Sequence, residues 1–261
     1  GNIKQEDSLE LIDSEANNYN VVLCNPPVGV RILERRPSVL QKFALGRKWE
    51  FNGGRIEPGD KVLPKQEVGI LFAELCVRQA APGGRIGIIL PNGYLGNTSP
   101  RYATLREWLL RHTRLVGVVA FPRFTFKKSG ADVSASAVIL EKRRTPLANS
   151  ADSEDYPFYA GNLESVGWSV SDKKAVRLFR RDAQTGAYLM DSNNNQISDA
   201  DFSRVLEDLM ASQVPNAFPW LLRNPPLPPT QPTGWNLQIS SVLTRHDRSI
   251  DPKRGCERMS L

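Results

Sequence analysis

The chain has 261 residues, of which 40% are hydrophobic and 24% are charged, as in an ordinary globular protein. This length suits one large domain or one domain with an appendage. No apolar run approaches the ~20 residues of a membrane span, and the start has no signal-peptide pattern. Three scattered cysteines show neither metal nor disulfide spacing, which predicts a reducing, cytoplasmic location. Only two histidines are present, which argues against a zinc hydrolase or a histidine-based triad.

The net charge is +6, and many of the basic residues are concentrated in two blocks. Residues 31–48 contain six basic residues and one acid, and residues 101–128 contain seven basic residues and one acid. Such blocks suit a polyanionic partner such as nucleic acid. A solvated basic face is the alternative that charge alone leaves open.

The first elements in chain order lead to a strand with an unusual end. Residues 2–10 predict a short strand followed by a turn at Asp7 and Ser8. Residues 19–24, YNVVLC, predict a buried strand because the apolar run at their end is unbroken. Residues 31–66 are charged and contain several glycines, which indicates a long loop with some helix.

Regular structure resumes after this loop. Residues 67–80 predict an amphipathic helix, with Glu74 and Arg78 on its outer face. Residues 81–91, APGGRIGIILP, predict a turn that feeds a strand. The change from helical to strand pattern over so few residues is typical of an α/β protein.

A second helix is expected up to His112, with Ser99 as its N-cap and Pro100 at the first helical position. Strands are predicted at residues 115–122 and 134–143. The order of elements predicts an α/β fold with a largely parallel sheet. The last two strands are joined by a loop alone, so they are expected to be antiparallel.

Asn25-Pro26-Pro27 directly follows the strand at 19–24, and ligands bind at the carboxyl ends of strands in open α/β sheets. The exocyclic amine of adenine is a poor nucleophile because its lone pair is delocalised into the ring. Two acceptors, the Asn25 side-chain oxygen and the Pro26 carbonyl, can hold the amine hydrogens and localise that lone pair. Proline sets its carbonyl direction through its fixed φ. A second Asn-Pro-Pro, at residues 224–226, lies in a proline-rich stretch after no strand and predicts only a stiff spacer.

The strand followed by Asn-Pro-Pro resembles the catalytic motif of amino-group DNA methyltransferases, which use S-adenosylmethionine (SAM). Residues 70–144 resemble the N6-adenine methylase domain of type I restriction-modification modification subunits. They contain, in that family's order, a helix, a PGGR turn, a strand ending in LPNG, a second helix and a strand followed by Thr125-Phe126. The resemblance covers roughly residues 2–144 and implies a Rossmann-like SAM-dependent methyltransferase fold.

The resemblance implies a role for several residues of the site. Asn25, Pro26 and Pro27 would form the catalytic turn. Asp7, in the segment QEDSL, matches the position of the acidic residue that contacts the adenine of SAM. The alternative for Asp7 is an ordinary turn cap.

The target base and the DNA backbone would be held by residues of two loops. Val28 stands where the family usually has an aromatic residue that stacks on the flipped base. Losing that stack is expected to cost ~1–3 kcal/mol. Phe126 matches the family's other loop phenylalanine, and with Val28 it would sandwich the base. The basic residues expected to contact phosphates are Arg123, Lys127 and Lys128.

The glycine-rich SAM loop of the family is not found among the 24 residues before Asn25. The chain is therefore expected to be a fragment, holding the C-terminal half of the sheet and an irregular α+β extension. The expected partners are duplex DNA and either specificity and restriction subunits or a fused target-recognition domain.

Four parts are expected along the chain. The first two are a partial catalytic domain at 1–145 and a polar extension at 146–222 with an irregular hairpin and a helix. They are followed by a proline-rich linker at 223–234 and by the start of a target-recognition or subunit-contact region at 235–261.

Two other functions remain open at this point. Asn-Pro-Pro also occurs in SAM-dependent methyltransferases that act on a protein glutamine or on RNA. A degenerate, non-catalytic half of a methylase would instead bind DNA or bridge subunits.

Overall fold

A five-stranded sheet forms the centre of the computed structural model, which describes residues 5–13, 16–27, 32–53, 55–123, 125–126, 134–171 and 174–222. The strand order is β1-β6-β8-β7-β9. The strands are β1 (Tyr19–Cys24), β6 (Ala80–Pro91), β7 (Thr113–Ala120), β8 (Ala135–Lys142) and β9 (Tyr159–Asn162).

The directions of the strands place the carboxyl ends of four strands at one side of this sheet. β1 pairs with β6 in parallel, β8 pairs with both β6 and β7 in the antiparallel sense, and β9 is parallel to β7. Consequently β1, β6, β7 and β9 all end at the same side of the sheet. This row of strand ends is here called the carboxyl edge, and it is distinct from the outermost strands of the sheet. The predicted α/β fold and its antiparallel last pair, β7 and β8, are confirmed.

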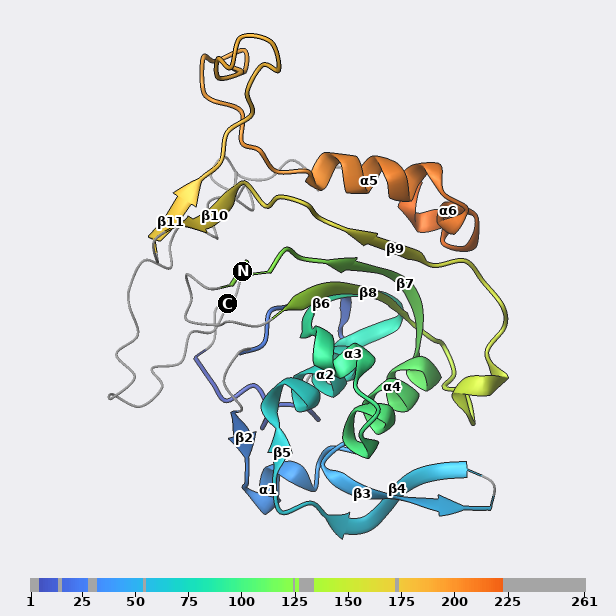
Figure 1. Ribbon diagram of the computed structural model, residues 1–261. Coiled ribbons are helices and arrows are strands. Elements are labelled where there is room, and N and C mark those ends of the chain that lie inside the picture. The colour runs from blue at the N-terminus through green and yellow to red at the C-terminus, as the bar shows by residue number, and fades with distance from the viewer. Residues whose placement is uncertain are drawn as a thin grey trace.

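Helices cover one face of the sheet, and most of the apolar core lies between these helices and the strands (Figure 1). They are α2 (Val68–Gln79), α3 (Asn92–Gly96) and α4 (Pro100–His112). Ile70, Leu105 and Trp108 from these helices pack against Ile86 and Ile88 of β6. The predicted helices at 67–80 and up to His112 are confirmed, and Ser99 is the N-cap residue of α4.

The outer face predicted for the first of these helices is wrong at Glu74. This side chain is completely buried, and its two oxygens accept hydrogen bonds from the backbone N–H groups of Ala44 and Leu45, both at 2.8 Å. The segment 41–46 packs over the side of α2 that the helical pattern assigned to solvent. Burial raises the pKa of the Glu74 carboxyl, although the two N–H donors oppose that rise.

The opposite face of the sheet is partly covered by the last described helices, α5 (Phe202–Ala211) and α6 (Val214–Ala217), and by the 3-10 helix η3 (Pro219–Leu221). Leu209, Val214 and Phe218 pack with Val116 of β7 in one buried cluster. The predicted helix of the extension is therefore confirmed as α5.

β1 is an edge strand of the sheet, and its prediction as a buried strand is wrong. Val22 and Cys24 pack against the main core, whereas Val21 and Leu23 are 52% and 75% exposed. α2 covers only one face of β1, so alternate side chains of its apolar run face outward.

Residues 31–66 contain more regular structure than the predicted long loop. β3 (Arg47–Asn52) and β4 (Arg55–Val62) form an antiparallel hairpin. Gly53 has a φ of +56° at the tip, as hairpin turns rich in Asn and Gly require. The short elements β2 (Leu33–Glu34), α1 (Pro37–Leu40) and β5 (Gln66–Glu67) complete the segment.

The extension joins the same sheet through β9, so residues 146–222 pack with residues 1–145 rather than apart from them. Its other elements are η2 (Ser150–Asp152) and the antiparallel pair β10 (Trp168–Ser171) and β11 (Lys174–Arg177). Isolated bridges, including Phe179 with Ser198, continue the predicted irregular hairpin. The division into four parts remains a prediction, and its parts after residue 222 lie outside the described residues.

The turn predicted at Asp7 is present, because the backbone N–H of Glu10 donates to the Asp7 carbonyl at 2.9 Å. The strand predicted before it lies largely outside the described residues. Among the helices of the described ranges, none is long and apolar enough to span a membrane.

Candidate functional site

The turn Asn25-Pro26-Pro27 lies at the carboxyl edge, directly after Cys24, which pairs with Ile88 of β6. Asn25 and Pro27 are exposed, while Pro26 is buried. The buried proline ring anchors the turn, and the exposed amide of Asn25 is accessible to a ligand. This arrangement offers an acceptor side chain beside a backbone carbonyl whose position is restricted.

The end of β6 lies next to this turn and is tied to the start of β8. The side-chain oxygen of Asn92 accepts a hydrogen bond from the Ser136 hydroxyl at 2.8 Å. The backbone N–H of Asn92 donates to the Ser134 carbonyl at 2.9 Å. These bonds hold the LPNG segment in place where β1 and β6 end.

A polar cluster at the carboxyl edge connects three helices and was not found from the sequence. Glu67, the N-cap residue of α2, accepts hydrogen bonds from the hydroxyls of Tyr94 and Tyr102, both at 2.9 Å. Arg101 pairs with the same carboxylate at 2.7 Å. Burial, together with Glu67, raises the pKa of the Tyr94 hydroxyl, which keeps it a donor. An acid directly before an apolar helix was the signal that could have indicated Glu67.

Phe126 lies in the loop that follows β7, at the same edge as Asn25. Its ring meets Phe121 edge to face, with centroids 5.6 Å apart, and it is half-buried. The Thr125 hydroxyl donates to the Pro122 carbonyl at 2.7 Å, which tightens this loop. Three strand spacings separate β1 from β7, or roughly 14 Å.

Arg123 is exposed in the same loop and has an interaction partner. Three other residues that the sequence nominated for base or phosphate contacts lie outside the described residues: Val28, Lys127 and Lys128. The structure therefore brings Asn25, Pro26, Pro27, Arg123 and Phe126 to one edge of the sheet.

Asp7 lies in a turn on the α1 side of the molecule, and both of its carboxylate oxygens have partners. One accepts from the backbone N–H of Leu9 at 3.2 Å, and the other pairs with Arg36 at 2.8 Å. Arg36 also pairs with Glu10 and Glu34, and the neighbouring carboxylates raise its pKa. These contacts explain Asp7 as a turn and ion-pair residue, and its contact with SAM remains a prediction.

Many side chains in the two basic blocks are used inside the protein rather than presented to a polyanion. Arg36, Arg101 and Arg114 form ion pairs with carboxylates. Others donate to main-chain carbonyls, such as Arg111 to Ile56 at 3.0 Å. The charge blocks of the sequence are therefore poor guides to a phosphate-binding surface here.

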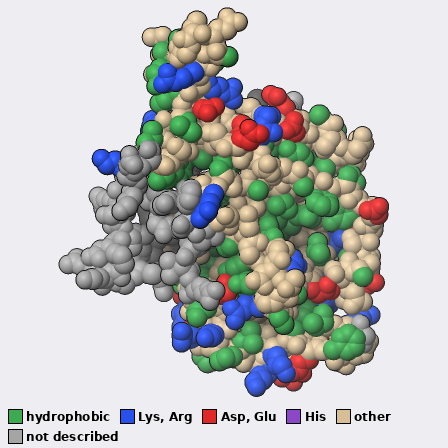
Figure 2. Space-filling model, viewed as in Figure 1, with side chains coloured by type: hydrophobic (Ala, Val, Ile, Leu, Met, Phe, Trp, Pro, Cys, Tyr) green, Lys and Arg blue, Asp and Glu red, His purple; other side chains and the backbone are tan. Residues whose placement is uncertain are grey.

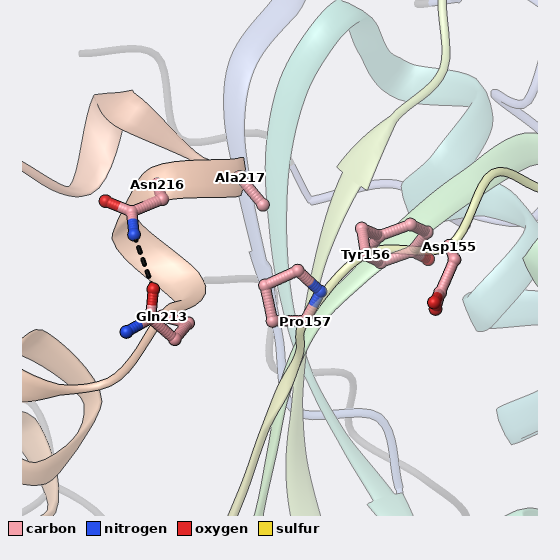
Figure 3. Close-up of a pocket in the computed structure, with 6 residues that line it drawn as sticks. All are labelled: Asp155, Tyr156, Pro157, Gln213, Asn216 and Ala217. Carbon is pink, nitrogen blue, oxygen red and sulfur yellow. Dashed lines mark hydrogen bonds between the residues drawn. The ribbon is translucent and has the colours of Figure 1, made fainter.

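One hollow of about 640 Å³ lies away from this site (Figure 3). Tyr156 and Pro157, just before β9, face Gln213, Asn216 and Ala217 across it. Because β9 runs from this hollow toward the carboxyl edge, the hollow lies toward the other end of the sheet from Asn25.

An α/β sheet with an antiparallel strand between parallel ones, and with Asn-Pro-Pro after one of its strands, is the arrangement that the resemblance to amino-group methyltransferases predicted. The family model described as N-6 DNA Methylase matches residues 1–223. The chain belongs to this family.

Solved structures of similar proteins have low sequence identity to this chain. A modification subunit assigned to a type I restriction enzyme from Vibrio vulnificus YJ016 is 24% identical, with a TM-score of 0.40, over 54% of this chain and 27% of that one. A protein from Listeria monocytogenes, assigned to the class I SAM-dependent methyltransferases, is 23% identical, with a TM-score of 0.39, over 56% and 37%.

A type I restriction-modification methyltransferase subunit from Streptococcus thermophilus is 20% identical, with a TM-score of 0.31, over 49% of this chain and 25% of that one. The chain thus matches between 25% and 37% of the length of these proteins. A comparison with curated proteins found no match.

Proposed function

We propose that the protein transfers a methyl group from SAM to N6 of adenine in duplex DNA, as the modification component of a restriction-modification system. The observation that carries the proposal is the exposed Asn25 at the carboxyl edge, beside the buried Pro26. Membership of the N-6 DNA methylase family supports it.

Asn25 and Pro26 act on the amine of the target base. The Asn25 side-chain oxygen and the Pro26 carbonyl accept the two hydrogens of N6, so that its lone pair points away from them. Because the Pro26 ring is buried, its carbonyl needs little reorganisation when the base arrives. The proton is lost to water after transfer, so the step requires no strong base.

SAM supplies the electrophilic methyl group when it is bound. Asp7 is the residue of this chain proposed to contact it. Its side chain is 18% exposed, and its carboxylate accepts from the backbone N–H of Leu9 and pairs with Arg36. A carboxylate is an acceptor of the kind that the donor groups of SAM require, and SAM would bind it beside the Arg36 ion pair.

The flipped adenine is proposed to lie between Val28 and Phe126, with Arg123, Lys127 and Lys128 contacting the phosphates of the DNA. For Phe126 this requires the ring to turn from Phe121 toward the base. Specificity and restriction subunits, or a fused target-recognition domain, complete the proposed assembly.

Asn25→Ala tests the proposal in the intact protein, and the second Asn-Pro-Pro provides a matched control, Asn224→Ala. We expect Asn25→Ala to reduce methyl incorporation into duplex DNA by roughly a hundredfold or more. Circular dichroism and SAM binding should be unchanged, and Asn224→Ala should methylate like the wild type. Undiminished methylation by Asn25→Ala would overturn the catalytic assignment. Incorporation into RNA or a protein glutamine in place of DNA would overturn the substrate.

A further inference from the structure

Residues 174–200 form an extended arm that projects from the body of the protein (Figure 1). The arm begins with β11, which pairs with β10, and then folds back on itself. Backbone bonds from Arg180 to Ile197 and from Leu189 to Arg180 hold its two sides together. Most of its side chains are exposed or half-buried, so the arm has no core of its own.

The base of the arm is anchored at the carboxyl edge. The backbone N–H of Leu163 donates to the carbonyl of Ala120, the last residue of β7, at 2.9 Å. Val166 and Ala200 form a bridge across the base, and Asp201 accepts from the backbone N–H groups of Glu164 and Ser165.

Packing connects this base to the loop of Phe126. Leu163 is buried with Val119, and Phe121 and Val166 pack against the same cluster. Phe121 in turn contacts Phe126 edge to face. The arm therefore starts beside a loop that belongs to the candidate site, and not at the distant end of the sheet.

The arm carries its positive charge close to this base. The segment 174–181, KAVRLFRR, contains four basic residues and no acid, and Figure 2 shows Lys and Arg side chains on the projecting part. Within the described part of the chain, no ion pair joins these side chains to a carboxylate. The four residues are Lys174, Arg177, Arg180 and Arg181.

Two acids of the arm are used by its turns, and a third, Asp199, lies across from the basic segment, where its backbone N–H donates to the Leu178 carbonyl at 2.9 Å. Asp182 accepts from the backbone N–H groups of Gln184 and Thr185, and Asp191 accepts from those of Asn193 and Asn195. Arg180 and Arg181 donate to the neutral carbonyls of Ala200 and Gly186, so their charges are not neutralised by these bonds. Unlike Arg36 and Arg101, the basic residues of the arm have no ion pair with a carboxylate among the described residues, and they outnumber the three acids of the arm by one.

We propose that the arm binds the phosphate backbone of duplex DNA beside the adenine that Asn25 receives. This inference deepens the proposed function and rests on it. Phosphate contacts position a protein on DNA without reading sequence, and each releases counterions from the duplex. An exposed basic strand at the carboxyl edge has the charge and the place for this task.

The test removes charge at Lys174 and Arg177, which are exposed and are the basic residues of the arm for which the structure records no side-chain hydrogen bond. The double variant Lys174→Gln/Arg177→Gln is compared with the wild type in the intact protein, using a fluorescent DNA duplex of mixed sequence. The matched control is Arg55→Gln/Lys61→Gln, which removes the same charge from the exposed β4 strand. That hairpin packs at the C-terminal end of α4, through Arg111 and Ile56, away from the carboxyl edge.

We expect the arm variant to bind DNA more weakly, with a slope of log K against log salt that is less negative by about 1.8, or 0.9 for each lost phosphate contact. The control variant should keep the wild-type slope, and both should melt like the wild type. An unchanged slope in the arm variant, while Asn25→Ala still abolishes methylation, would overturn this inference and leave the proposed function standing. If the wild type methylates no DNA while the arm variant still binds DNA more weakly, the proposed function is overturned instead.

Discussion

Asn25 and Pro26 are neighbours in the chain but differ in burial, and the proposed chemistry uses both conditions. A side chain that must meet a base has to be accessible, as Asn25 is. A carbonyl that must keep one direction benefits from a ring held in the protein, as Pro26 is. The difference arises because the strand ends at Cys24 and the turn leaves the edge of the sheet at once.

His112 is a second residue whose environment sets its chemistry. Its Nδ1 donates to the carbonyl of Trp108 at 2.7 Å, and its ring stacks on the indole of Trp108. Burial lowers the pKa of His112 below its ordinary 6.5, and the nearby positive charges act in the same direction. Those charges belong to Arg78, Arg111 and Lys142.

This shift predicts a loss of stability in mild acid. As pH falls through 6.5, the unfolded histidine binds a proton more readily than the folded one, so the free energy of unfolding decreases. We expect His112→Gln to show a flatter decrease between about pH 8 and pH 5 than the wild type. Urea unfolding at several pH values measures it.

The other histidine supplies the control for this experiment. His246→Gln should keep the wild-type pH dependence, because the prediction depends on the buried ring of His112. Identical slopes for His112→Gln and the wild type would show that another group controls the acid transition.

At the scale of elements, Glu67 joins the starts of α2 and α4 to the short helix α3. Its carboxylate accepts hydrogen bonds from Tyr94 of α3 and from Arg101 and Tyr102 of α4. All of these contacts lie at the carboxyl edge, close to the end of β6. The cluster therefore stabilises the helices that border the proposed site.

Removing this carboxylate is expected to destabilise the protein. Glu67→Ala leaves the buried Tyr94 hydroxyl without its acceptor and removes the ion pair of Arg101, whose side chain is 41% exposed. We expect the free energy of unfolding to fall by about 3 kcal/mol, the upper end for lost hydrogen bonds to a buried charged group. Chemical denaturation of the variant measures this change.

A double variant separates the contact from other effects. Tyr94→Phe alone should cost about 2 kcal/mol, and the loss in Glu67→Ala/Tyr94→Phe should be smaller than the sum of the two single losses. Strict additivity would indicate that the hydroxyl and the carboxylate act independently, contrary to the structure.

At the scale of the whole molecule, the extension is part of the fold rather than an appendage. β9 adds a strand to β7, and Phe218 is completely buried beside Val116 of that strand. The ring of Phe218 also meets Tyr156 edge to face, with centroids 5.8 Å apart. A sheet that lacked these contacts would expose apolar residues of β7 on its second face.

Phe218→Ala is therefore expected to destabilise the entire domain, by about 3–5 kcal/mol. Thermal unfolding should remain a single transition that moves to lower temperature, as seen by both circular dichroism and tryptophan fluorescence. Leu222→Ala, at an exposed position nearby, should change stability by less than about 0.5 kcal/mol. Two separate transitions would mean that the extension folds independently.

Local patterns predicted the helices α2, α4 and α5 and the strands β1, β6, β7 and β8, because periodicity and breaker residues are read from neighbouring positions. The hairpin of β3 and β4 was missed although Asn52-Gly53 is a hairpin signal, because charged residues obscured the apolar alternation. β9 was missed because four residues of mixed character become a strand only when β7 supplies a partner.

By itself the sequence determined the α/β order of elements and the place of Asn-Pro-Pro at a strand end, since both depend on short stretches of chain. Only the tertiary structure decided that β1 lies at an edge, that Glu74 is buried under residues 41–46, and that Arg36 and Arg101 are occupied by carboxylates. It also placed the basic arm at the same edge as Asn25. These features depend on contacts between residues far apart in the chain, and no local pattern records which partners will meet.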